Sequence, residues 1–170
     1  MFFVKKIPSL FIASVFKNVF FVAVAACLFA SCKKLDVFEK NISVPQYKWQ
    51  YQFQPDFEFS INDTAANYKI FIILRHTDAY RYNNIWLNIA TKNPGDSSYK
   101  TQRFDLQLGA DATGWEGAGM DDIWELRKSI TNGPVKFTRP GNYKFKISHI
   151  MRENPLPNIL SVGVRVEKVR

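Results

Sequence analysis

The chain has 170 residues, of which 46% are hydrophobic, with 23 Lys and Arg against 15 Asp and Glu. Removal of residues 1–31 would leave 139 residues, the size of one domain, and the loss of three lysines would lower the formal net charge from +8 to +5. The remaining basic residues are scattered, which argues against a nucleic-acid-binding protein. Both cysteines lie within the first 32 residues, so the rest of the chain has no disulfide.

The N-terminal segment has the pattern of a lipoprotein signal peptide. Lysines at positions 5, 6 and 17 precede an unbroken apolar run over residues 19–30, and small residues follow before Cys32 and two further lysines. A positive segment, a short apolar segment and small residues at the cleavage site define a secretory signal. Because this signal ends at a cysteine, we expect residues 1–31 to be removed and Cys32 to be acylated, which would anchor the protein to a membrane.

Besides an ordinary signal peptide without lipidation, two alternatives for this segment stay open. Cys27 also follows small and apolar residues, and by residue type it is the better match to a lipoprotein cleavage site. Cleavage there would leave three apolar residues at the mature N-terminus, so Cys32 at the polar boundary is preferred. An uncleaved transmembrane helix over residues 7–31 would be long enough to span a bilayer, but Lys17 interrupts it.

The residues after Cys32 divide into a tether and a folded domain. Residues 35–46 have mixed charge, contain Pro45 and show no sustained period, so residues 32–47 are predicted to form a lipidated tether. Fully extended, such a tether would reach roughly 50 Å. The folded domain is predicted to cover residues 48–170.

From Trp49 onward, apolar and polar residues alternate with the two-residue period of β-strands. The alternation is found at residues 49–53, 57–61, 83–90, 104–108, 143–147 and 160–166, whereas residues 68–74 are almost continuously apolar, as in a strand covered on both faces. Residues 123–130 fit either a strand or a helical turn. Turn-forming residues separate these segments. About eight strands without a long helix predict an all-β fold, a two-sheet antiparallel β-sandwich of jelly-roll or immunoglobulin-like type.

A glycine-rich segment over residues 109–122 is the most unusual stretch. Its carboxylates, Asp111, Glu116, Asp121 and Asp122, could bind calcium, but their spacing differs from that of an EF-hand loop. We expect instead a connection between the sheets, with glycines at positive φ and Trp115 folded back onto the core.

The sequence has few residues of the types that usually serve in catalysis or metal binding. The chain has only two histidines, His76 and His149, both near strand ends, whereas a metal site needs three or four converging ligands. No G-x-S-x-G motif is present, and no cysteine follows Cys32. We therefore expect no enzyme activity, metal, cofactor or small-molecule substrate.

The aromatic residues suggest one alternative function. Four tryptophans and seven tyrosines could include exposed platforms on which sugar rings stack, as in carbohydrate-binding β-sandwiches. Most of these rings are needed in the core. Trp86 is the best candidate for exposure, because its neighbours Ile85 and Leu87 claim the opposite face of the strand.

An ordered set of motifs covers almost the whole mature chain. They are Ser31-Cys32, Val37-Phe38-Glu39, Trp49, Arg75-His76, Tyr80-x-Tyr82-x-Asn84-Ile85-Trp86-Leu87, Gly114-Trp115-x-Gly117-x-Gly119, Gly141-x-Tyr143-x-Phe145, His149-x-Met151-Arg152, Leu156 and Val162-Gly163-x-Arg165-Val-Glu167. With these motifs the chain resembles the gliding motility lipoprotein family GldH. It departs from the family pattern at Pro157-Asn158, where a glycine is expected before Ile159, and this departure puts the local turn in question.

The resemblance implies a lipoprotein of the cell envelope that is needed for gliding and is linked to the motility and secretion apparatus. The implied partners are other envelope proteins of that apparatus, and the expected location is the outer membrane, facing the periplasm. The family assigns no catalytic residues. The candidate interaction residues are Arg75, His76, Tyr80, Tyr82, Asn84, Trp86, Trp115 and Arg152.

Overall fold

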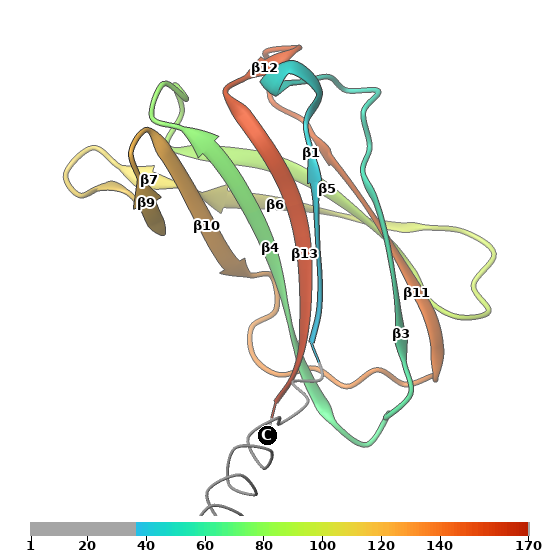
Figure 1. The fold of residues 1–170 in the computed structure, drawn as a ribbon. Coiled ribbons are helices and arrows are strands. Elements are labelled where there is room, and N and C mark those ends of the chain that lie inside the picture. Colours follow the sequence, from blue (N-terminus) through green and yellow to red (C-terminus); the bar gives the residue numbers. More distant parts are fainter. Residues whose placement is uncertain (1–36, 170) are drawn as a thin grey trace, which may run out of the picture. The chain divides into compact units, whose positions relative to one another are not determined.

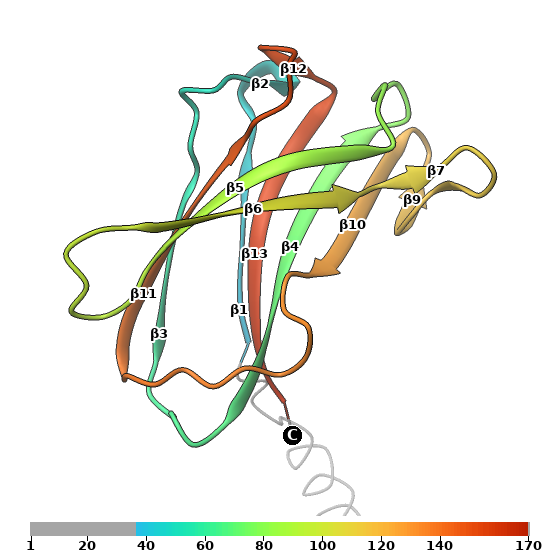
Figure 2. The same ribbon diagram turned by 180° about the vertical axis from the view of Figure 1, so that it is seen from behind.

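The computed structural model describes residues 37–169, which form two facing antiparallel β-sheets (Figures 1 and 2). The five-stranded sheet has the order β1 (Val37–Ser43), β13 (Ile159–Val169), β4 (Asn67–Thr77), β10 (Ile123–Ser129) and β9 (Ala118–Met120). The four-stranded sheet has the order β3 (Asp56–Ile61), β11 (Gly141–His149), β5 (Asn84–Lys92) and β6 (Lys100–Gln107). The predicted all-β antiparallel sandwich is confirmed.

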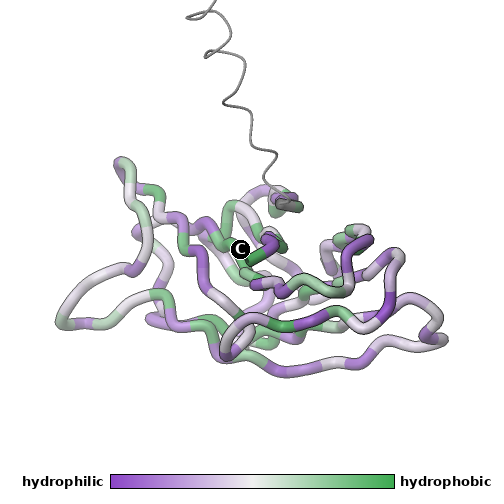
Figure 3. The backbone as a smooth tube through the Cα atoms, turned by 90° about the horizontal axis from the view of Figure 1, so that it is seen from below, coloured by the Kyte–Doolittle hydropathy of each residue, from purple (hydrophilic) through white to green (hydrophobic). Residues whose placement is uncertain are grey.

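Burial follows the alternation that the sequence shows. In β3 every second residue is buried, and hydrophobic and hydrophilic residues alternate along the strands in Figure 3. The inward residues of both sheets form one core, which explains how a domain without disulfides is held together. The middle of β4 is buried on both faces, since Ile72, Ile73 and Leu74 have no exposed surface, as the apolar run predicted.

The two ends of the sandwich differ in what they carry. At the lower end in Figure 1 lie the start of β1, the connection between β3 and β4, and the end of β13. The strand registers agree, because Val37 pairs with Glu167 and Asn67 pairs with Val169. At the upper end, the short strands β2 (Lys48–Trp49) and β12 (Leu156–Pro157) pair with each other.

The predicted tether is wrong from Val37 onward. Strand β1 pairs with β13 along its whole length, and it is followed by the buried Val44 and the short 3-10 helix η1 (Pro45–Tyr47). As an edge strand, β1 carries mostly exposed or half-buried residues, so its hydrophobic period is weak. The folded domain therefore includes residues 37–47. The predicted signal peptide and Cys32 lie outside the described residues, and the described part contains no helix able to cross a membrane.

Three further segments differ in detail from the sequence prediction. The expected strand over residues 49–53 stops at Trp49, and a turn follows. The ambiguous segment over residues 123–130 is strand β10. The glycine-rich connection between the two sheets contains β7 (Gly109–Ala110), β8 (Gly114–Trp115) and β9.

The glycine-rich connection otherwise follows the prediction. Gly114 and Gly117 have positive φ values of 75° and 99°. Trp115 is half-buried and packs against the core. An added Cβ at Gly117 would overlap the carbonyl oxygen of Glu125, so the close approach of these two backbones requires glycine.

The departure at Pro157-Asn158 has a local explanation. Asn158 has a φ of 67°, in the left-handed region that glycine occupies readily and asparagine tolerates. Its Nδ2 donates a hydrogen bond of 2.9 Å to the carbonyl oxygen of Ala79. Asparagine thus supports the turn that the family pattern assigns to glycine.

Candidate functional site

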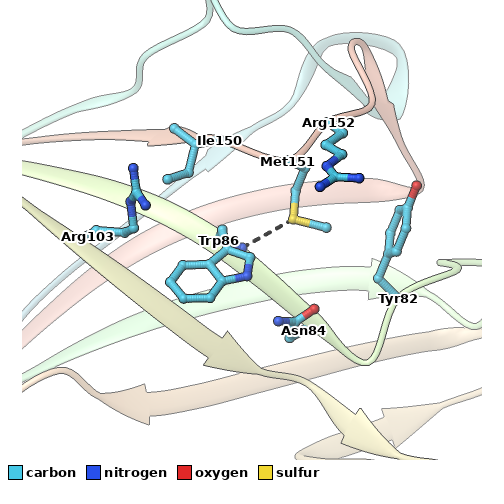
Figure 4. Close-up of a pocket in the computed structure, with 7 residues that line it drawn as sticks. All are labelled: Tyr82, Asn84, Trp86, Arg103, Ile150, Met151 and Arg152. Carbon is cyan, nitrogen blue, oxygen red and sulfur yellow. Dashed lines mark hydrogen bonds between the residues drawn. The ribbon is translucent and has the colours of Figure 1, made fainter.

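A pocket lies on the outer face of the four-stranded sheet, near the upper end of β11 (Figure 4). Its volume is about 490 Å³, within the range of binding pockets for small molecules and side chains. It is lined by Tyr82, Asn84, Trp86, Arg103, Ile150, Met151 and Arg152. We call it the Trp86 pocket.

The strand period places Trp86 in this pocket. Ile85 and Leu87 are fully buried in the core, so the side chain between them points to the opposite face of β5. Trp86 is 38% exposed, which confirms the predicted exposure. Arg103 reaches the same face from β6, because it pairs with Asn88, two residues along β5 from Trp86.

Backbone hydrogen bonds hold one wall of the pocket in place. The N–H of Ile150 donates to the carbonyl oxygen of Trp86 over 2.9 Å, and the N–H of Trp86 donates to the Met151 sulfur over 3.3 Å. The hydroxyl of Tyr51 donates to the carbonyl oxygen of Met151 over 2.6 Å. Trp86, Ile150 and Met151 are therefore fixed relative to one another without any ligand.

A second set of contacts fixes Tyr82. Its hydroxyl donates to Glu153 Oε2 over 2.9 Å, while Arg81 Nη2 donates to the other oxygen, Glu153 Oε1, over 2.6 Å. The hydrogen bond to Glu153 raises the pKa of Tyr82 above its ordinary value, so the phenol stays protonated and keeps donating. The Glu153 carboxylate is in turn already occupied by two donors.

Three of the predicted residues form an aromatic cluster next to Tyr82. The ring of His76 lies 4.6 Å from that of Trp115 and 5.6 Å from that of Tyr80, between ring centroids. Tyr80 donates to the carbonyl oxygen of Asn84 over 3.1 Å, and its ring meets that of Tyr82 edge-on at 5.6 Å. Burial lowers the pKa of His76 and raises that of Tyr80, so both are neutral near pH 7.

The structure therefore divides the eight predicted residues into three groups. Tyr82, Asn84, Trp86 and Arg152 line the pocket, whereas His76, Tyr80 and Trp115 form the aromatic cluster next to Tyr82. Arg75 belongs to neither group, because it lies half-buried on β4 and pairs with Glu125, with 3.5 Å between Nε and Oε2.

Sequence reasoning missed three lining residues, Arg103, Ile150 and Met151. The motif His149-x-Met151-Arg152 includes two of the lining residues, but only Arg152 is among the candidates from the sequence. Arg103 had no signal of its own, because its place beside Trp86 depends on the register between β5 and β6. A single sequence shows β5 and β6 only as two separate alternating segments and does not show which of their residues pair.

The lining of the Trp86 pocket consists of aromatic, aliphatic, thioether, amide and guanidinium side chains. Its lining includes no histidine, serine, threonine, cysteine or carboxylate that could serve as a nucleophile or a general base. Across residues 37–169, no group of three or more His, Cys, Asp and Glu side chains is placed to hold a metal ion. The carboxylates of the glycine-rich connection do not form such a group.

Among solved structures, the chain is similar to two carbohydrate-binding modules at low identity. One is specific for non-crystalline cellulose, at 14% identity and a TM-score of 0.38, covering 78% of this chain and 73% of that one. The other is a family 35 module from Clostridium thermocellum, at 13% identity and a TM-score of 0.33, covering 76% and 91%. Similarities at this level carry no information about a ligand.

Sequence relatives are much more informative. A gliding motility lipoprotein GldH homolog from Christiangramia forsetii is 31% identical, covering 89% of this chain and 95% of the relative. Gliding motility lipoprotein GldH from Flavobacterium johnsoniae is 30% identical, covering 89% and 97%. The family model described as GldH lipoprotein matches residues 36–166, which is nearly the whole described domain. The chain therefore belongs to the GldH lipoprotein family.

Proposed function

We propose that this protein is a lipid-anchored, non-catalytic component of the bacterial gliding machinery, working through contacts with other proteins of the cell envelope. The observation that carries the proposal is the match to gliding motility lipoproteins over nearly their full length. The Trp86 pocket adds support, since it offers aromatic, methionine and arginine side chains of the kind enriched at protein interfaces, and no catalytic group.

The strand order would give the anchored domain a defined orientation. If Cys32 is acylated, four residues separate it from the start of β1, and the five steps from Cys32 to Val37 reach at most about 18 Å. The lower end of the sandwich would then lie close to the membrane, which we expect to be the outer membrane on its periplasmic side. The eleven residues of β13 span about 35 Å, so the Trp86 pocket near the upper end of β11 would face away from the lipid.

The test is deletion of the gene, followed by complementation with the natural protein and with Cys32→Ala. We expect deletion to abolish spreading on a surface and secretion of cell-surface adhesins, and we expect the unlipidated variant not to restore them. Normal gliding after deletion would contradict the proposal.

Acyl labelling tests the anchor separately. Cys32→Ala is expected to abolish labelling, while Cys27→Ala is expected to leave it intact. If Cys27→Ala alone blocks labelling, the tether begins five residues earlier in the chain.

One observation favours a second candidate function, a lipid-anchored carbohydrate-binding module. The half-exposed Trp86 ring is a surface on which a sugar ring could stack. Glycan arrays would reveal such binding, whereas pull-down with other motility lipoproteins would reveal assembly. Sugar binding that is lost in Trp86→Ala, together with normal gliding of the deletion strain, would favour the carbohydrate-binding function.

A further inference from the structure

The Trp86 pocket carries two positive charges that the described domain leaves unpaired. Arg103 and Arg152 lie on either side of Trp86 in Figure 4, and both are exposed. Neither guanidinium group makes a hydrogen bond or an ion pair with a residue between positions 37 and 169. Guanidinium groups bind carboxylates through paired, charge-assisted hydrogen bonds, so this arrangement suits a ligand with negative charge.

The nearby carboxylates do not satisfy these arginines. Asp105 lies beside Trp86 in the strand register, and its Oδ1 accepts a 2.6 Å hydrogen bond from Asn84. Glu153 is occupied by Arg81 and Tyr82. Both acidic groups are therefore engaged next to the pocket, while both guanidiniums remain available to a ligand.

The rest of the pocket combines the polar side chains of Tyr82 and Asn84 with an apolar wall. Trp86, Ile150 and Met151 form this wall, and hydrogen bonds from the N–H groups of Ile150 and Trp86 and from the Tyr51 hydroxyl fix it in advance. Tryptophan, tyrosine and arginine dominate the binding energy of protein interfaces, and a preformed site avoids the entropy cost of ordering on binding.

We propose that the Trp86 pocket binds an acidic peptide segment of a partner protein. The carboxylates of the segment meet Arg103 and Arg152, and an aromatic or aliphatic side chain between them covers the Trp86 ring. The inference deepens the proposed function and rests on it, because it assumes that the partner is a protein. It adds the chemistry of the partner and the place where the partner docks.

The experiment uses the full-length protein in detergent and a panel of defined peptides. In each peptide two Asp or Glu residues flank one Phe, Trp or Leu at varied spacing, and a matched peptide carries Asn or Gln instead. Binding is measured by calorimetry at low and at physiological salt. We expect at least one acidic peptide to bind about tenfold more tightly than its amide match, and we expect this difference to shrink as salt rises.

Variants locate the binding site. Arg103→Gln, Arg152→Gln and Trp86→Ala are each expected to weaken binding about tenfold. Lys136→Gln removes one positive charge at an exposed position on the connection between β10 and β11 and should leave binding unchanged. Urea unfolding midpoints equal to that of the natural protein verify that each variant is folded.

Several outcomes would overturn the inference. They are equal binding of acidic and amide peptides, no binding by any acidic peptide, an effect of Lys136→Gln as large as that of the pocket variants, or tighter binding of oligogalacturonate than of any peptide. The proposed function is judged separately by gliding of the deletion strain. If acidic peptides bind but the deletion strain glides normally, the motility role is refuted. If the deletion strain loses gliding but no acidic peptide binds, only the proposed docking site is refuted.

Discussion

Gly117 is the position at which the backbone leaves least room for a side chain. It combines a φ of 99° with a close approach to the backbone of Glu125, whereas Gly114 has a φ of 75° and no neighbour within 4 Å of an added Cβ. We expect Gly117→Ala to lower the free energy of unfolding by at least about 2 kcal/mol, through strain and overlap together. Gly114→Ala should cost only about 1 kcal/mol, from strain alone. Urea unfolding measures both, and equal losses would refute the role of the Glu125 contact.

The two buried histidines predict how stability depends on pH. Burial lowers the pKa of His76 and His149 below the ordinary value of 6.5, so the unfolded chain binds more protons than the folded domain just below that pH. The contribution of these histidines to the free energy of unfolding should therefore be complete above pH 6.5 and should fall as the pH decreases through the folded pKa values. The slope is at most about 1.4 kcal/mol per pH unit for each imidazole.

Substitution isolates this effect. His149→Phe keeps a ring between Trp49 and Tyr51 but cannot titrate, so its free energy of unfolding should vary less between pH 7 and 5. The carboxyl groups whose pKa values are lowered by ion pairing, Glu39 and Asp63, have ordinary values of 4.5 and 3.8 and lose their contribution only at lower pH. A stability that is constant from pH 7 to 5 would contradict the prediction.

At the scale of elements, β1 decides where the folded domain begins. Phe38 and Ile42 pack against the core, Val44 is buried, and Arg165 of β13 donates to Glu39 over 2.6 Å. A chain that starts at residue 48 loses all of these contacts and leaves β13 unpaired on one side. We expect its free energy of unfolding to fall by at least about 3 kcal/mol relative to a chain that starts at residue 36. Equal urea midpoints for the two chains would show that residues 36–47 do not stabilise the domain and belong to the tether.

At the scale of the whole molecule, the start of β1 bears on the distance between the domain and the membrane. If Cys32 carries the lipid, as we propose, the start of β1 at Val37 leaves a tether too short for the domain to range far from the membrane. Fifteen Gly and Ser residues inserted after Leu35 should therefore reduce surface spreading, since the Trp86 pocket would no longer be held at a defined height. The same insertion between the exposed Ser97 and Ser98 lengthens the chain but not the tether. If the two insertions have equal effects on spreading, the distance from the membrane does not matter.

Local pattern was enough to predict the fold class and several single residues. Alternation with a period of two predicted strands wherever one face is buried, and it placed Trp86 on the outer face because Ile85 and Leu87 fill the core. It failed at β1, where an edge strand buries too little on either side to show a period, and at residues 50–53, where alternating residues form a turn. In those segments, contacts with residues that are distant in the sequence decide the structure, and local strand propensity does not.

The sequence by itself determined the all-β class, the family motifs and four of the seven residues that line the pocket, because each of these is visible in a short local pattern. Only the tertiary structure decided that Arg103 and Met151 join Trp86, that His76, Tyr80 and Trp115 cluster next to Tyr82, and that Arg75 lies apart from both. These relations depend on strand register and on the order of strands in the two sheets. Register arises from the packing of all the strands at once, so no single segment encodes it.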